Sequence, residues 1–146
     1  MNIYTIGFTQ KSAEDFFTLI ASNNIKRIVD VRVNNTSQLS GFAKRDDLSF
    51  FLSRLTQAEY VHLPELAPTK ELLATYQKKK LSWTQYEEEF LNLMARRNIE
   101  KIIKINDLYD GCLLCSEHKP HQCHRRLVLE YLAKYSETNF QIKHLY

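Results

Sequence analysis

Segments with the hydrophobic pattern of strands alternate with segments that have the hydrophobic periodicity of helices along this chain of 146 residues. Short apolar runs, some alternating with polar residues, are typical of buried strands, and they lie at residues 3–9, 27–32, 60–62, 112–115 and 140–145. Between them, apolar residues recur every three or four positions, as on one face of a helix. Strands separated by helices favour right-handed crossovers and a parallel sheet. The pattern therefore predicts an α/β fold over residues 1–146: a single three-layer domain with a mostly parallel sheet of about five strands and helices on both faces.

Capping residues predict where several helices begin. Ser12, Thr69 and Ser82 each precede a helical pattern, and Ser82 with Gln85 has the sequence of a capping box. Residues 99–108 also favour a helix. Another helix is expected to open at Asp46 and Asp47 and to present one apolar face, made of Leu48, Phe51, Leu52 and Leu55.

Composition is that of an ordinary globular protein. Hydrophobic residues make up 44% and charged residues 25%, which excludes a disordered or fibrous chain. The net charge of +3 permits a nucleic-acid partner without requiring one. Three cysteines, an odd number, argue against a disulfide framework and for a reducing compartment. No signal peptide or membrane-length apolar run is present, so we expect a cytoplasmic protein with no membrane partner and an oligomeric state that the sequence leaves open.

Reactive side chains are densest in the segment that joins strand 112–115 to a helix expected to start near His121. In open α/β sheets, ligands bind beyond the carboxyl ends of the strands, and the start of a helix favours an anion. The loops after the other strands should converge on the same edge. The residues expected there are Thr9, Asp30, Arg32, Ser37, His62, Glu65, Cys115, Glu117, Cys123, His124 and Arg125.

Each reactive residue in this segment has a functional and a structural interpretation. Cys115, at a strand end before a helix that carries arginine, has the placement of a nucleophilic thiol, although a buried structural thiol is the alternative. Glu117 is a candidate general acid or base. His124 is either a proton-transfer group or a hydrogen-bonded core histidine. Arg125 is expected to turn towards the helix start and solvent.

Charged residues after the second strand allow two arrangements. Asp30 and Arg32 should point to the same side of the sheet, because strand side chains alternate, and they would then form an ion pair. Alternatively, Arg32 and Arg125 would clamp a bound anion from two sides. Either arrangement places a guanidinium group near the predicted pocket.

The spacing of four residues superficially resembles that of zinc ligands: Cys112, Cys115, Cys123 and His124. Residues three apart on a strand point to opposite faces, however, and neighbours on a helix diverge by about 100°. The sequence therefore predicts no metal site and no cofactor.

Short blocks spread over most of the chain resemble the signature blocks of the domain of unknown function 488 family. They are residues 4–7, 30–32, 64–66 and 115–117, followed by 123–125. The resemblance implies a small three-layer α/β domain and assigns no activity. This chain departs from the family's pattern at Phe8, where many members have histidine, and at residues 34–36, which lack a frequent proline.

The hypothesis that follows is an enzyme acting on a phosphate-bearing or other anionic substrate, a class that includes nucleotides and nucleic acids. Its catalytic residues would be Cys115, Glu117 and His124. The alternative is a non-catalytic module that binds a nucleotide or nucleic acid in the same pocket.

Overall fold

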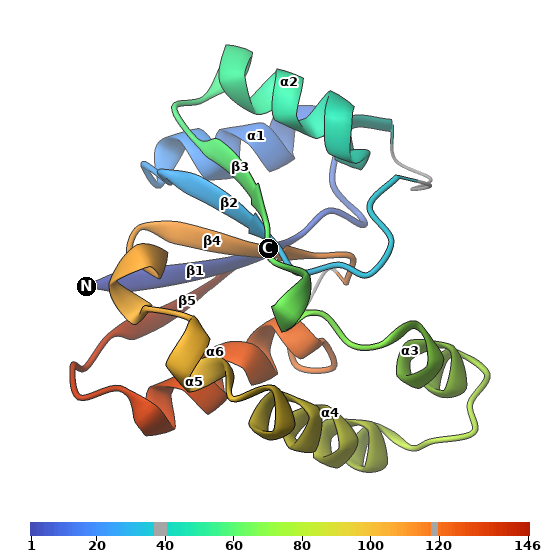
Figure 1. Ribbon diagram of the computed structural model, residues 1–146. Helices are drawn as coiled ribbons and strands as arrows, with labels where there is room; N and C mark the ends of the chain where they lie inside the picture. The colour runs from blue at the N-terminus through green and yellow to red at the C-terminus, as the bar shows by residue number, and fades with distance from the viewer. Residues whose placement is uncertain (37–40, 118–119) are drawn as a thin grey trace.

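A parallel sheet lies at the centre of the protein, whose computed structural model describes residues 1–36, 41–117 and 120–146. The strands lie in the order β3 (Glu59–His62), β2 (Arg27–Asp30), β4 (Gly111–Cys115), β1 (Asn2–Gly7) and β5 (Gln141–Leu145). All neighbouring pairs are parallel. Figure 1 shows this sheet between two layers of helices, which confirms the predicted α/β class, strand number and placement of helices.

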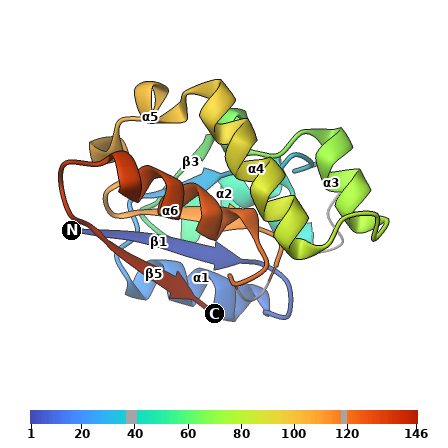
Figure 2. The ribbon, with the colours of Figure 1, turned by 90° about the horizontal axis from the view of Figure 1, so that it is seen from below.

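The two helical layers differ in size. One face of the sheet is covered by α1 (Ala13–Ser22) and α2 (Arg45–Leu55), with the short 3-10 helix η1 (Gly41–Ala43). On the other side lie η2 (Pro64–Leu66), α3 (Lys70–Gln77), α4 (Trp83–Arg97), α5 (Ile99–Ile102), η3 (Ile105–Leu108) and α6 (His124–Tyr135). Figure 2 shows α6 running along the sheet with α4 crossing beside it. No helix in the described ranges is both long and apolar enough to cross a membrane.

Alternation along β4 divides the core into two clusters. Leu113 and Cys115 pack in the cluster that includes α4 and α6, whereas Cys112 and Leu114 pack against α1 and α2. All four side chains are buried. Cys112 and Cys115 therefore lie on opposite faces of the sheet, as the two-residue period of a strand requires.

Helix starts follow the predicted capping residues. The hydroxyls of Ser12 and Thr69 accept hydrogen bonds from backbone N–H groups in the first turns of α1 and α3. At the start of α4, Ser82 and Gln85 make both bonds of a capping box. These local bonds satisfy N–H groups that have no partner inside the helix.

Two helical predictions are only partly correct. Leu48 and Leu52 of α2 are fully buried, but Phe51 is 36% and Leu55 56% exposed, because these two side chains border an open hollow between α1 and α2. The predicted helix over residues 99–108 is divided into α5 and η3, because the backbone between them is extended.

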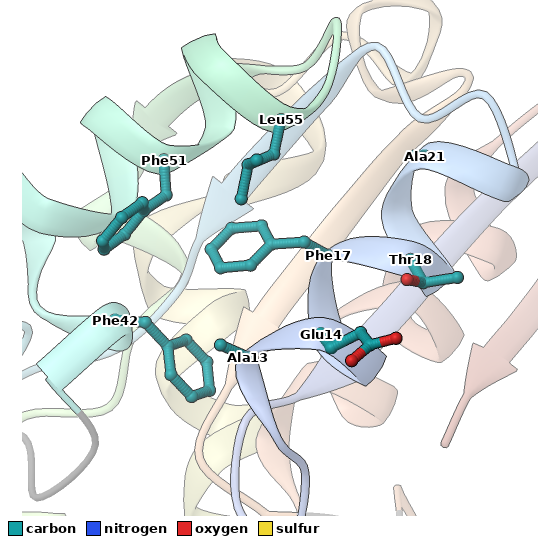
Figure 3. Close-up of a pocket in the computed structure, with 8 residues that line it drawn as sticks. All are labelled: Ala13, Glu14, Phe17, Thr18, Ala21, Phe42, Phe51 and Leu55. Atoms are coloured by element: carbon teal, nitrogen blue, oxygen red, sulfur yellow. The ribbon is translucent and has the colours of Figure 1, made fainter.

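Phe51 and Leu55 line a shallow apolar cavity of about 320 Å³ between α1 and α2 (Figure 3). Phe17 of α1 and Phe42 of η1 form the opposite wall. Glu14 is the one charged side chain among its described lining residues. The cavity lies on the sheet face away from Cys115 and brings no group of reactive side chains together.

Candidate functional site

Four neighbouring strands end at one edge of the sheet. Their last residues are Gly7, Asp30, His62 and Cys115, and the register places Gly7 beside Cys115 and Asp30 beside His62. The chain leaves β1 and β2 towards the layer of α1 and α2, but it leaves β3 and β4 towards the other layer. Adjacent strands with opposite exits create a crevice, which is where open α/β sheets bind ligands. Cys115 lies at this crevice.

A cavity of about 290 Å³ opens beside Cys115. One wall is aromatic and consists of Tyr76, Trp83 and Tyr86 from α3 and α4. Arg32 and Asn34 contribute to another side. The polar end is formed by Cys115, Ser116, Glu117, Gln122, Cys123 and His124. The cavity therefore brings together the three predicted catalytic residues, Cys115, Glu117 and His124, with the predicted binding residues Arg32 and Cys123.

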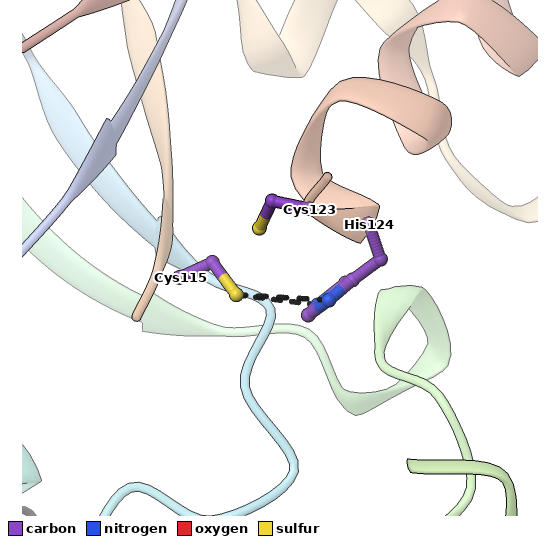
Figure 4. Close-up of side chains that lie close together, drawn as sticks. All are labelled: Cys115, Cys123 and His124. Atoms are coloured by element: carbon purple, nitrogen blue, oxygen red, sulfur yellow. Dashed lines mark hydrogen bonds between the residues drawn. The ribbon is translucent and has the colours of Figure 1, made fainter. Parts of the chain in front are cut away.

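Three buried side chains converge at the base of this cavity (Figure 4). The Sγ atoms of Cys115 and Cys123 and a ring nitrogen of His124 all lie within 4.8 Å of one another. Cys115 Sγ is 3.6 Å from His124 Nδ1. His124 Nε2 lies 2.7 Å from the carbonyl oxygen of Val31, which accepts hydrogen bonds only. Nε2 therefore carries the proton and Nδ1 is the unprotonated nitrogen. Cys115 Sγ is also 3.9 Å from Nε2, so the sulfur lies beside the ring and close to both nitrogens.

The start of α6 explains this convergence and corrects the sequence analysis. The helix begins at His124, not near His121, and Cys123 is its N-cap with an extended backbone (φ −142°, ψ 139°). The divergence of about 100° expected between helical neighbours does not apply to a residue outside the helix. Cys115, Cys123 and His124 therefore do not diverge as predicted, whereas Cys112 does face the other core cluster.

Arg125 is fully buried, so the expectation that it turns towards solvent is wrong. Its Nε donates a hydrogen bond to Thr5 Oγ1 (3.2 Å), and its Nη1 donates to the carbonyl oxygen of Glu117. Helix α6 packs directly on the sheet, so this residue of its first turn meets β1. Gly7 is required beside it, because a Cβ there would overlap the Glu117 carbonyl.

Electrostatic surroundings distinguish the three thiols. A hydrogen bond with the Cys123 side chain lowers the pKa of Cys115 below the usual value for a thiol. Burial opposes this shift, while the positive charge of Arg125 and two backbone hydrogen bonds support it. Burial raises the pKa of Cys123 and of Cys112. Cys115 is thus the thiol most easily converted to the nucleophilic thiolate.

Asp30 and Arg32 form the predicted ion pair. Arg32 Nε and Nη2 each lie 2.8 Å from a carboxylate oxygen of Asp30, and both side chains are buried. Tyr60 donates a further hydrogen bond to Asp30, and Arg32 Nη1 donates to the carbonyl of Ala43. Each nitrogen of the Arg32 guanidinium group therefore already has a protein acceptor, and the pair anchors the loop after β2 beside the cavity.

Among the described residues, three other predicted binding residues do not line the cavity around Cys115: Thr9, His62 and Glu65. Thr9 donates a hydrogen bond to the Ser116 carbonyl, and a ring nitrogen of His62 lies 3.2 Å from the Arg32 carbonyl. Glu65 is exposed, and its carbonyl oxygen accepts a hydrogen bond from Arg97. Ser37 lies outside the described residues.

The aromatic wall is the part of the site that sequence reasoning missed. The Trp83 and Tyr86 rings stack at 5.4 Å, and Tyr76 lies 4.7 Å from Tyr86. The helical spacing of Trp83 and Tyr86 indicates a core stripe, and Tyr86 is indeed buried. Nothing local indicates that these rings also border a cavity, because its opposite side comes from distant segments.

Comparison with known protein families gives one match. The family described as "Domain of unknown function DUF488" matches residues 12–132 of the 146-residue chain. The match begins at the N-cap of α1 and ends within α6, so it includes the converging residues at the base of the cavity. No curated protein and no solved structure matches the chain. The chain belongs to the DUF488 family.

Proposed function

We propose that this protein is an enzyme that uses Cys115 as a nucleophile on a phosphate-bearing substrate, a class that includes nucleotides. One observation carries the proposal: Cys115 Sγ lies 3.6 Å from the unprotonated Nδ1 of His124, beside a cavity at the carboxyl edge of the sheet. A thiol next to an oriented imidazole has the arrangement of an activated cysteine nucleophile.

The surroundings of the pair support an anionic substrate. The cavity includes the residues around the start of α6, a helix of 12 residues, whose positive end favours negative charge. The buried guanidinium group of Arg125 adds a full positive charge behind Cys123, with Nη1 3.8 Å from its Sγ. Because the guanidinium groups of Arg32 and Arg125 already bind protein acceptors, they would act on the substrate through their charge.

The proposed reaction has two displacements. The thiol proton of Cys115 passes to His124 Nδ1, and the sulfur attacks phosphorus. An S–P bond forms while the P–O bond to the leaving group breaks, and the leaving oxygen takes the proton from His124. Water then attacks phosphorus, the S–P bond breaks, and Glu117 transfers the proton of that water to the departing thiolate. The free thiol of Cys115 is restored, and inorganic phosphate is released.

The burial of the Cys115 thiol favours a second candidate function. Cys115 is only 6% exposed, so a substrate reaches its sulfur only at the base of the cavity. A protein that holds a nucleotide against the aromatic wall without reacting with it would have the same cavity. The second candidate is therefore a non-catalytic nucleotide-binding module.

Trp83 allows both candidates to be tested, because it is the single tryptophan of the chain and lines the cavity. Quenching of its fluorescence by nucleoside monophosphates and inorganic phosphate would measure binding, and release of phosphate from nucleotides and p-nitrophenyl phosphate would measure turnover. Cys115→Ser should retain binding and lose at least about 1,000-fold in turnover. Cys112→Ser changes a thiol on the opposite sheet face and should leave turnover unchanged.

The outcomes separate the candidates. Turnover that survives in Cys115→Ser would show that Cys115 is not the nucleophile. Binding without turnover in the wild type would favour the binding module. If neither binding nor turnover is found with this panel, the proposal of a phosphate-bearing substrate is wrong.

A further inference from the structure

We propose that Cys115, Cys123 and His124 form a binding site for one thiophilic divalent metal ion of the zinc type. The inference goes beyond the proposed function and does not depend on it, because it rests on the relative positions of three ligand atoms. All three side chains are buried at the base of the cavity, and their ligand atoms lie within 4.8 Å of one another.

One of the three ligand separations matches tetrahedral coordination, and the other two are limited to 4.8 Å. Zinc lies about 2.3 Å from sulfur and about 2.0–2.1 Å from nitrogen, so a tetrahedral ion places these ligands roughly 3.6 Å apart. Cys115 Sγ and His124 Nδ1 are 3.6 Å apart. Because the other separations extend up to 4.8 Å, the side chains would have to rotate towards one another to bring all three ligand atoms onto one ion.

Hydrogen bonds already orient the ligands. His124 Nε2 donates to the Val31 carbonyl, which leaves Nδ1 as the metal-binding nitrogen. Arg125 Nη1 lies 3.8 Å from Cys123 Sγ and donates towards it. Metal-bound histidines commonly donate their second N–H group to a carbonyl or carboxylate, and such contacts hold the ring in position.

The ligand types determine which ion is expected. Two sulfurs and an imidazole favour Zn²⁺, whereas Mg²⁺ and Ca²⁺ favour oxygen. Cys112 cannot add a fourth sulfur, because it faces the other side of the sheet. Three protein ligands would leave a fourth coordination position, and because all three residues line the cavity, water or a small molecule from the cavity would fill it. A metal bound here would also coordinate the sulfur lone pair with which Cys115 acts as a nucleophile, so it would inhibit the proposed reaction.

Cobalt titration provides the direct test. Untagged protein is stripped of metal with a chelator under reducing conditions and then titrated with Co²⁺. One equivalent should produce intense tetrahedral d–d bands and thiolate-to-cobalt charge-transfer absorption, and Zn²⁺ should displace the cobalt. An absence of saturable binding, or a cobalt spectrum without thiolate charge transfer, would overturn the proposal.

Variants identify the ligands. Cys115→Ser, Cys123→Ser and His124→Ala should each weaken Zn²⁺ binding by at least about 100-fold, because even changes beyond the ligands cost about 10–100-fold. Cys112→Ser is the matched control and should bind Zn²⁺ like the wild type. Should a ligand variant fail to fold, X-ray absorption of the zinc-loaded wild type should show two sulfur ligands and one imidazole. A shell of oxygen and nitrogen alone would refute the assignment.

Measuring turnover and metal content on the same samples tests the metal site and the proposed function separately. Turnover in stripped protein that depends on Cys115, with inhibition by stoichiometric Zn²⁺, would support both. Turnover that depends on Cys115 without any zinc binding would refute the metal site alone. Turnover that requires the metal would refute the free-thiol nucleophile and leave the metal site standing.

Discussion

Replacement of Asp30 by asparagine should remove a large part of the protein's stability. The Asp30 carboxylate is fully buried and accepts hydrogen bonds from the backbone N–H, Nε and Nη2 of Arg32 and from the Tyr60 hydroxyl. Asparagine keeps the size of the side chain but removes its charge and presents an NH₂ group to donors. The Arg32 guanidinium group, which is 2% exposed, would then be buried without its counter-charge.

The expected loss in the free energy of unfolding is about 3–5 kcal/mol, the usual cost of removing one partner from a buried ion pair. Since native proteins are stable by about 5–15 kcal/mol, the change is a substantial fraction of the total. The matched control is Asp46→Asn, in an ion pair with Arg45 whose side chains are 89% and 49% exposed. That variant should lose less than about 1 kcal/mol.

Urea unfolding followed by circular dichroism at several pH values measures both effects. Burial alone would raise the pKa of Asp30, but hydrogen bonds and charge from Arg32, with the Tyr60 hydrogen bond, hold it below the ordinary value of 3.8. A depressed pKa adds stability above the ordinary value, and this stability is lost as pH falls through the folded-state pKa. The difference in the free energy of unfolding between wild type and Asp30→Asn should therefore have its largest value at neutral pH and decrease below pH 3.8. A neutral-pH difference under about 1 kcal/mol, or one that grows on acidification, would refute the reasoning.

Two further predictions concern residues around the cavity. In metal-stripped protein at neutral pH, iodoacetamide should alkylate Cys115 at least about 100-fold faster than Cys112, because the pKa of the first thiol is lowered and that of the second is raised. Mass spectrometry of the labelled peptides measures the ratio, and equal rates would contradict the prediction. Gly7→Ala should cost about 1–3 kcal/mol in urea unfolding, because its Cβ would overlap the Glu117 carbonyl. Gly41→Ala, where a Cβ meets nothing within 4 Å, is the control, and an equal loss there would exclude the proposed overlap.

Local sequence determined the elements and much of their placement. A strand exposes alternate residues to opposite faces, so the three-residue spacing of Cys112 and Cys115 alone separates the two thiols. The same period predicts that Asp30 and Arg32 meet. Caps such as Ser82 were also predictable, because they bond to N–H groups only a few residues away.

Tertiary packing alone decided the geometry of the site. The position at which α6 starts sets whether Cys123 has helical or extended backbone, and thus whether its sulfur meets Cys115 and His124. The tautomer of His124 depends on the Val31 carbonyl, which lies 93 residues away in sequence. Arg125 is buried because α6 packs on the sheet and its first turn reaches Thr5 of β1, a contact that periodicity within one segment cannot specify. Periodicity specifies which face of an element is apolar, whereas the position of each reactive atom depends on contacts between segments far apart in the chain.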